Sequence, residues 1–251
     1  MKQEVKTLEY LCWPFRVIYK IYFMFVFGTL LVAIYPALYY FLANPKRFPK
    51  AFVLMRYFAF ALFFATGIKL KVKGSENIPR SGAYIICANH TSFLDAFCIY
   101  TFVKQYFVFT GKKEIEKWPL FHIAYTSGMN ILVDRHSKTG SVKALKRMLE
   151  EIDKGHSLAM FPEGTISKNP PHTGPFKPGA FSIAIQKQVS VLPVTFTTNW
   201  KRLQRGGLWK GKAGPGIAEI IIHKPVPTAG LTKENVDQLQ NTVRSIIVRS
   251  I

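Results

Sequence analysis

The stretch AYIICANHTSFLD, residues 83–95, decides the fold that we expect, because it joins a buried strand to the start of a helix. Residues 83–88 form an apolar run that is typical of a strand covered on both faces. His90 follows this strand, and Asp95 lies five residues further on, in the predicted helix. If the carboxylate meets the imidazole, it fixes the tautomer of the ring and raises its basicity for general-base catalysis. The spacing alone is not specific, and a turn that caps the helix is the structural alternative.

Short apolar runs recur after residue 67 and alternate with helical patterns. The predicted strands cover residues 68–73, 83–88, 106–110, 130–133, 157–161, 189–197 and 217–223. Two helices show apolar faces, which consist of Val142, Leu145, Leu149 and Ile152 in the first and Val236, Leu239, Val243 and Ile246 in the second. Strands that alternate with helices predict an α/β fold with a mostly parallel sheet flanked by helices, whose ligands gather beyond the strand ends.

The start of the chain is strongly apolar. Residues 21–42 carry no charge and are long enough to cross a hydrocarbon core of about 30 Å. Residues 51–66 contain Arg56 and are short for a span, so we expect an interfacial or re-entrant helix. A cleaved signal peptide is the alternative for the first segment, but the long region before it and the lack of a small-residue cleavage site count against it. We therefore predict a membrane anchor over residues 1–67 and one α/β domain over residues 68–251.

The chain is basic as well as apolar. Its 251 residues include 34 Lys and Arg against 14 Asp and Glu, a net charge of +20, with 49% hydrophobic residues and a mean hydropathy of +0.11. This composition excludes a disordered basic tail, which has few apolar residues, and a collagen-like or disulfide-framework chain. Residues 164–218 contain eight basic residues and no acid. Such an excess predicts an anionic partner, and the three Cys, an odd number, fit a reducing compartment.

Two further motifs follow predicted strands. Residues 161–165 (FPEGT) form a Glu-Gly-Thr turn, and a loop rich in Pro and Gly then leads to residues 175–181 (PFKPGAF). The turn exposes backbone N–H groups, a carboxylate and a hydroxyl, which together can hold a glycerol or a phosphate oxygen. Residues 128–135 (GMNILVDR) bring Arg135 to another strand end, and Arg is suited to bidentate phosphate binding. An ion pair of Arg135 with Asp134 or another neighbour is the structural alternative.

In this order, the blocks NHTSFLD, GMNILVDR, FPEGT with PFKPGAF, and VLPVTF resemble those of the glycerolipid acyltransferases, which include the 1-acylglycerol-3-phosphate acyltransferases. The resemblance extends from about residue 68 to residue 198. It implies that His90 and Asp95 form the catalytic dyad. It also implies that the acceptor is bound by a second set of residues, namely Arg135, Glu163, Gly164 and Thr165.

The resemblance implies transfer of a fatty acyl group from a coenzyme A or acyl-carrier-protein thioester to the sn-2 hydroxyl of 1-acylglycerol-3-phosphate (lysophosphatidic acid), giving phosphatidic acid. Because a thioester is already activated, His90 needs only to take the proton of the hydroxyl while Asp95 stabilises the imidazolium. We expect no metal and no cofactor beyond the thioester co-substrate. The expected partners are membrane phospholipids, lysophosphatidic acid and the thioester carrier, with no nucleic acid. The catalytic domain, residues 68–251, is expected at a membrane and facing the cytoplasm.

One position departs from the pattern of the family, whose third block usually reads Glu-Gly-Thr-Arg, whereas this chain has Ile166. Lys168 or Lys177 could supply the missing charge, and we include Lys177 among the expected substrate-binding residues, although Lys lacks the planar fork of Arg. The departure keeps open a different acceptor, a lysolipid without a phosphate such as a lyso-amino-acid lipid. The second alternative is a non-enzymatic, membrane-anchored basic binding module, which explains the charge but leaves the motifs as coincidences.

Overall fold

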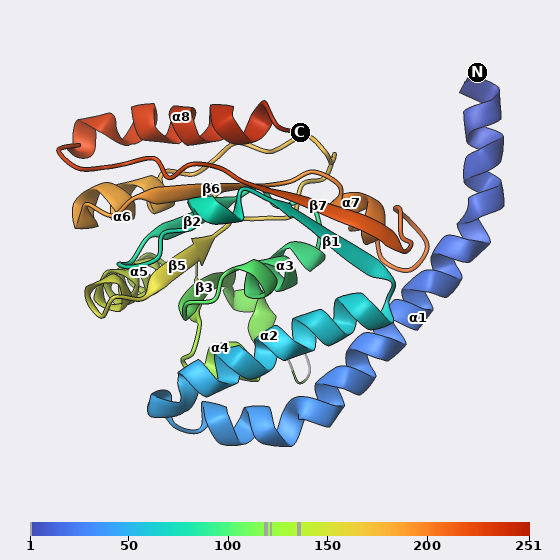
Figure 1. Ribbon diagram of the computed structural model, residues 1–251, viewed down its shortest axis with the longest axis horizontal. Coiled ribbons are helices and arrows are strands. Elements are labelled where there is room, and N and C mark those ends of the chain that lie inside the picture. Colours follow the sequence, from blue (N-terminus) through green and yellow to red (C-terminus); the bar gives the residue numbers. More distant parts are fainter. Residues whose placement is uncertain (1, 118–119, 121, 135–136) are drawn as a thin grey trace.

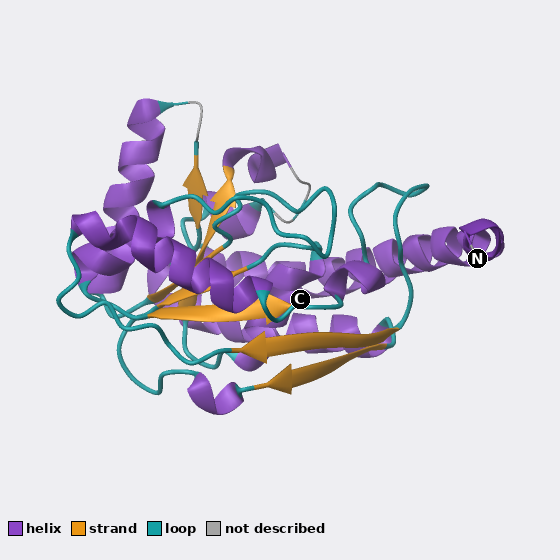
Figure 2. Ribbon diagram, turned by 90° about the horizontal axis from the view of Figure 1, so that it is seen from above, coloured by secondary structure: helices purple, strands orange, loops and turns teal. Residues whose placement is uncertain are grey.

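One mixed sheet runs through the chain after the apolar start (Figure 1, Figure 2). The computed structural model describes residues 2–117, 120, 122–134 and 137–251. Within these residues the sheet has seven strands, which are β1 (Ile68–Lys73), β2 (Ile85–Ala88), β3 (Phe107–Lys112), β4 (Ile131–Val133), β5 (Ser157–Met160), β6 (Val191–Phe196) and β7 (Gly216–Ile222). Their order across the sheet is β1-β7-β6-β2-β5-β3-β4.

The strand pairings are parallel, except that β6 and β7 run antiparallel. β2 lies at the centre of the sheet, where Ile85 is opposite Leu158 of β5 on one side and Val191 of β6 on the other. All four residues of β2 are buried, as expected for a continuous apolar run covered on both faces. The mostly parallel sheet that the sequence predicts is thereby confirmed.

Helices cover both faces of the sheet (Figure 1). The helices within the described residues are α1 (Lys2–Leu42), α2 (Phe48–Ala65), α3 (Leu94–Phe102), α4 (Ile123–Thr126), α5 (Lys138–Asp153), α6 (Gly179–Lys187), α7 (Asn199–Arg202) and α8 (Val236–Val248), with 3-10 turns at Pro45–Arg47, Ser75–Asn77, Lys113–Lys117 and Lys233–Asn235. Successive side chains of a strand point to opposite faces. Ile86 therefore packs into the core shared with α1, α2 and α3, whereas Ile85 packs into the core shared with α5, α6 and α8.

The helices α1 and α2 form a hairpin against the α3 side of the sheet (Figure 1). The ring of Phe27 in α1 packs edge-on against those of Phe58 in α2 and Phe97 in α3, at centroid distances of 5.5 and 5.7 Å. The outer surface of the hairpin exposes large apolar side chains, including Phe15, Met24, Phe25, Tyr57 and Phe64. Two stretches, Cys12–Leu42 and Pro45–Ala65, are long and apolar enough to cross a membrane. These features suggest membrane association, while the boundary at residue 67 and the interfacial or re-entrant placement of residues 51–66 stay predictions.

The apolar face of α5 differs from the predicted one. The structure buries Ala144, Met148 and Ile152, whereas Val142 and Leu145 are 65% and 41% exposed. Both sets satisfy the spacing of three and four residues that places side chains on one face of a helix. The periodicity of this segment therefore fits two overlapping faces, and packing against β4 and β5 decides between them.

Phe52→Ala is expected to lower the free energy of unfolding by about 3–5 kcal/mol, because it leaves a cavity between α2 and the sheet. Phe52 is 2% exposed, and its ring centroid lies 5.1 Å from that of Phe107. Denaturant unfolding in detergent micelles measures the change. Phe64→Ala is the matched control on the same helix, where the side chain is 89% exposed, and its midpoint should not move. Equal losses in the two variants would contradict the described packing of α2.

Candidate active site

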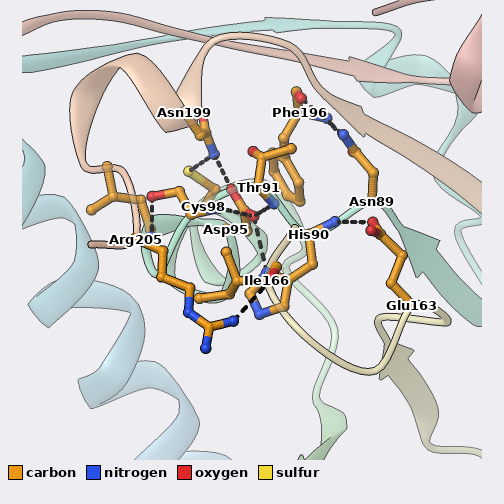
Figure 3. Close-up of polar contacts among 12 residues, drawn as sticks. Asn89, His90, Thr91, Asp95, Cys98, Glu163, Ile166, Phe196, Asn199 and Arg205 are labelled. Atoms are coloured by element: carbon orange, nitrogen blue, oxygen red, sulfur yellow. Dashed lines mark hydrogen bonds and ion pairs between the residues drawn. The ribbon is translucent and has the colours of Figure 1, made fainter. Parts of the chain in front are cut away.

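The turn between β2 and α3 brings a histidine and an aspartate together (Figure 3). Nδ1 of His90 lies 3.0 Å from Oδ2 of Asp95, which is in the first turn of α3. The same Oδ2 accepts the backbone N–H groups of Thr91 at 2.6 Å and Ser92 at 2.8 Å. The carboxylate thus satisfies two backbone donors in the turn before the helix and also contacts the imidazole. The predicted contact of His90 with Asp95 is present, whereas Asp95 does not cap α3, because the two N–H groups that it accepts belong to residues before the helix.

The environment of Asp95 orients the imidazole. Asp95 is fully buried, and its second oxygen, Oδ1, accepts a hydrogen bond of 2.8 Å from Nδ2 of Asn199. A carboxylate flanked by donors only accepts hydrogen bonds, so we assign the ring hydrogen of His90 to Nδ1. Nε2 is then the nitrogen that can take a proton, and 17% of the His90 side chain is exposed. The ring of Phe161 stacks on that of His90 at 4.0 Å, which further limits its rotation.

Asn199 is a site residue that the sequence reasoning missed. It begins α7 directly after β6 and lies 104 positions from Asp95 in the chain. The signal for it is a polar run, residues 197–199, at the end of a buried strand. Asn89 has a related role, because its side-chain amide donates to and accepts from the backbone of Phe196, at 3.0 and 2.7 Å. The two asparagines therefore hold the ends of β2 and β6 in register around the pair.

Glu163 lies in the turn after β5 and accepts two backbone hydrogen bonds at the site. Its Oε1 accepts the backbone N–H of His90 at 2.8 Å, and its Oε2 accepts that of Gly174 at 2.7 Å. Burial raises the pKa of the Glu163 carboxyl above its usual value, although these two hydrogen bonds act in the opposite direction. Gly164 adopts a φ of +71°, which side chains rarely tolerate and which lets the turn reverse here. Both carboxylate oxygens are thus used to join two turns, and contact of Glu163 with an acceptor stays a prediction.

The turn after Glu163 is approached by an arginine that no motif indicated. Nη1 of Arg205 lies 3.5 Å from Oγ1 of Thr165 and 3.4 Å from the carbonyl oxygen of Ile166 (Figure 3). The Ile166 side chain is buried, at 7% exposure. Lys168 and Lys177 are exposed. The backbone N–H of Lys177 donates a hydrogen bond to the carbonyl oxygen of Pro162. Among the residues that the structure describes, Arg205 is thus the cation whose side chain contacts this turn.

The predicted site residues differ in what the structure shows of them. It brings together the catalytic candidates and the Glu-Gly-Thr turn, namely His90, Asp95, Glu163, Gly164 and Thr165. Arg135 lies outside the described residues, so its place in the site stays a prediction. The residues after β2 and those after β5 lie close together because these two strands are parallel neighbours, so both segments leave the sheet at the same edge.

Two surface cavities are lined by other residues. One, of about 430 Å³, is lined by residues of α5 and of the turn before α2, and the other, of about 410 Å³, lies between α1 and residues 201–215. The second has four basic side chains in its lining, Arg16, Lys201, Arg202 and Lys212. Neither lining includes His90, so neither cavity is assigned to the reaction.

Comparisons with known proteins agree with this geometry. The Acyltransferase family model matches residues 69–197. The chain is 32% identical to the 1-acyl-sn-glycerol-3-phosphate acyltransferase of Borreliella burgdorferi, over 80% of this chain and 79% of that protein. It is 35% identical to the enzyme of the same name from Helicobacter pylori, over 65% of this chain and 68% of that protein.

Other matches differ in how much of each protein they cover. The chain is 34% identical to the chloroplastic 1-acyl-sn-glycerol-3-phosphate acyltransferase LPAT1 of Arabidopsis thaliana over 73% of its length, but it spans about half, 49%, of that relative. The crystal structure of the 1-acyl-sn-glycerophosphate (LPA) acyltransferase PlsC of Thermotoga maritima superimposes with a TM-score of 0.75 at 27% identity, covering 94% of each chain. The match with PlsC includes the long apolar helices as well as the sheet, because it covers nearly all of this chain.

Asn199→Asp is expected to lower stability by roughly 1–3 kcal/mol at neutral pH, because a donor to Asp95 becomes a second buried carboxylate. Adjacent carboxylates raise the pKa of the pair, so the folded state favours the protonated form. Stability is then retained at low pH and lost as the pH rises through the raised pKa. Unfolding at pH 5 and pH 8 measures this dependence, with Asn169→Asp at an exposed position as the control. A deficit that does not grow with pH would contradict the described contact.

Proposed function

Because the chain belongs to the acyltransferase family, we propose that it transfers a fatty acyl group from a thioester to the sn-2 hydroxyl of 1-acylglycerol-3-phosphate, giving phosphatidic acid for phospholipid synthesis. The observation that carries the proposal is the contact of 3.0 Å between His90 Nδ1 and Asp95 Oδ2, which leaves Nε2 as the nitrogen that can take a proton. Relatives that bear the name of this activity support the choice of acceptor.

The proposed reaction needs one base and no protein nucleophile. Nε2 of His90 takes the proton of the acceptor hydroxyl while its oxygen attacks the thioester carbonyl carbon. The tetrahedral intermediate then expels the sulfur, and the imidazolium of His90 returns the proton, so that an ester and a free thiol result. Asp95 stabilises the imidazolium, and the hydrogen bond from Asn199 keeps the carboxylate oriented toward Nδ1.

The proposed donor is an acyl thioester of coenzyme A or acyl carrier protein, with no metal and no other cofactor. Both carriers are anionic, as are the acceptor and the phospholipids of a membrane, and the chain carries a net charge of +20. We propose that the catalytic domain works at a membrane surface on the cytoplasmic side, where the apolar hairpin of α1 and α2 holds it. This arrangement gives the site access to a lipid acceptor and to a soluble donor.

A lysolipid without a phosphate is the second candidate acceptor, and the observation that favours it is Ile166. Its side chain is apolar and buried, at the position where the family usually has Arg. A non-enzymatic basic binding module is a weaker candidate. It would leave the fully buried Asp95, the oriented imidazole of His90 and the bracing by Glu163 without a function.

Purified protein in detergent micelles is expected to release free thiol from an acyl thioester when lysophosphatidic acid is added. A thiol-reactive dye measures the release, and extraction of phosphatidic acid identifies the product. Monoacylglycerol and a lyso-amino-acid lipid with the same acyl chain test the second candidate acceptor. Release with these lipids alone would replace lysophosphatidic acid as the acceptor, and no release with any acceptor would refute the enzymatic proposal.

His90→Ala is expected to lower kcat by about 10²–10⁴-fold, the usual contribution of a general base. Expression, membrane association and the unfolding midpoint should be unchanged, because the imidazole is at the surface of the site rather than in the core. His172→Ala is the matched control, since its side chain is exposed and it lies outside the pair. Activity of His90→Ala equal to that of the wild type would remove His90 from the mechanism.

A further inference from the structure

The loop of residues 203–213, which we call the bridging loop, connects α7 to β7 and contacts both the anchor and the site. On the side of the site, the hydroxyl of Ser92 donates to the carbonyl oxygen of Leu203 at 2.6 Å, and Ser92 also forms an isolated antiparallel bridge with Gln204. A second bridge, between Leu203 and Ala213, closes the base of the loop. The start of the bridging loop is therefore held against the turn between β2 and α3.

The far end of the bridging loop is held by α1. The rings of Trp13 and Trp209 stack at 5.9 Å, and Nε1 of Trp13 donates to the carbonyl oxygen of Trp209 at 3.0 Å. Lys20 is 4% exposed, and its ammonium group donates to the carbonyl oxygens of Gly207, at 2.8 Å, and Lys210. A buried ammonium group needs such acceptors, so this contact favours one conformation of the loop. The anchor helix thus determines where the bridging loop lies.

Arg205 extends from the bridging loop to the turn after Glu163 (Figure 3). Its Nη1 makes long contacts of 3.5 Å with Oγ1 of Thr165 and 3.4 Å with the carbonyl oxygen of Ile166. No carboxylate forms an ion pair with Arg205 among the residues that the structure describes. A guanidinium group has five N–H donors in a planar fork, and these two contacts use one nitrogen. Arg205 therefore retains donors, and an uncompensated charge, for an anion beside the Glu-Gly-Thr turn.

We infer that Arg205 binds the phosphate of the acceptor, and that α1 positions Arg205 through the bridging loop. This inference rests on the proposed function and adds the residue that recognises the headgroup. A guanidinium fork matches the oxygens of a phosphate monoester, which it can bind in a bidentate manner. In lysophosphatidic acid the phosphate is on the carbon next to the one that bears the reacting hydroxyl. An acceptor with its hydroxyl at His90 Nε2 must therefore keep its phosphate near the same turn.

The phosphates of the acyl donor, unlike that of the acceptor, do not have to lie near this turn. The phosphates of a coenzyme A or acyl-carrier-protein thioester lie at the far end of the pantetheine arm, many bonds from the carbonyl carbon that is attacked. A cation next to the turn that braces His90 is in reach of the acceptor phosphate and not of the donor phosphates. Arg205 thus explains how this chain can recognise a phosphate although residue 166 is Ile.

Arg205→Ala is expected to raise the KM for lysophosphatidic acid about 10–100-fold, because a charge-assisted, bidentate contact is lost. The KM for the acyl thioester and the rate with monoacylglycerol should not change, since neither depends on an acceptor phosphate. Arg205→Lys keeps the charge without the fork and should give an intermediate KM. Arg249→Ala is the matched control, because it removes an exposed guanidinium group at the end of α8.

Lys20 is the positioning residue, and Lys20→Met tests its action through Arg205. The variant is expected to raise the KM for lysophosphatidic acid several-fold with little change in kcat. Lys20→Arg keeps the positive charge and should have the KM of the wild type. In the Arg205→Ala background, Lys20→Met should have no further effect on this KM, because the group that it positions is absent. Additive effects of the two substitutions would overturn the role of α1.

Binding is measured separately from turnover, by titrating the tryptophan fluorescence of the micellar protein with lysophosphatidic acid or monoacylglycerol. Tighter binding of the phosphate-bearing lipid by the wild type, lost in Arg205→Ala, supports the inference. That result without thiol release would refute the proposed function and leave the phosphate site standing. Equal affinities of the wild type and Arg205→Ala for lysophosphatidic acid would overturn the inference, as would a rise in the KM for the thioester instead of the acceptor.

Discussion

The buried carboxylate of Asp95 is the interaction on which the arrangement of the site depends. Its oxygens receive the N–H groups of Thr91 and Ser92, the imidazole of His90 and the amide of Asn199. A buried charge is tolerated only when hydrogen bonds replace its lost hydration. The same contacts therefore shape the turn, orient the imidazole and join α3 to α7.

The parallel centre of the sheet explains how residues far apart in the chain come to one place. β2 lies between β5 and β6 and runs parallel to both, so the segments after these three strands meet at one edge. They bring His90, Glu163 and Asn199 to the same small region. The polar residues of the site follow the strands, whereas the apolar residues within the strands pack into the two cores.

The antiparallel strand β7 has a further consequence for function. Because β7 reverses direction relative to β6, the connection between them must turn back, and this connection is the bridging loop of residues 203–213. It lies between the site and α1, where Lys20 and Trp13 hold it. The basic residues of the loop, Arg205, Lys210 and Lys212, therefore belong to a segment that contacts both the apolar helix α1 and the turn between β2 and α3.

The sequence by itself determined the approximate positions of the strands and the local turn that carries His90 and Asp95. The strands are short apolar runs, and His90 and Asp95 are five residues apart in one turn, so local patterns indicate both. The tertiary structure alone decided that Asn199 supports Asp95, that Glu163 braces the backbone, and that Arg205 reaches the turn at Thr165. These contacts join residues that are 104, 73 and 40 positions apart. They depend on the order of the strands and on the path of one loop, and no local pattern of residues encodes either. The apolar face of α5 follows the same rule, because two faces satisfy its periodicity and only packing against the sheet selects one.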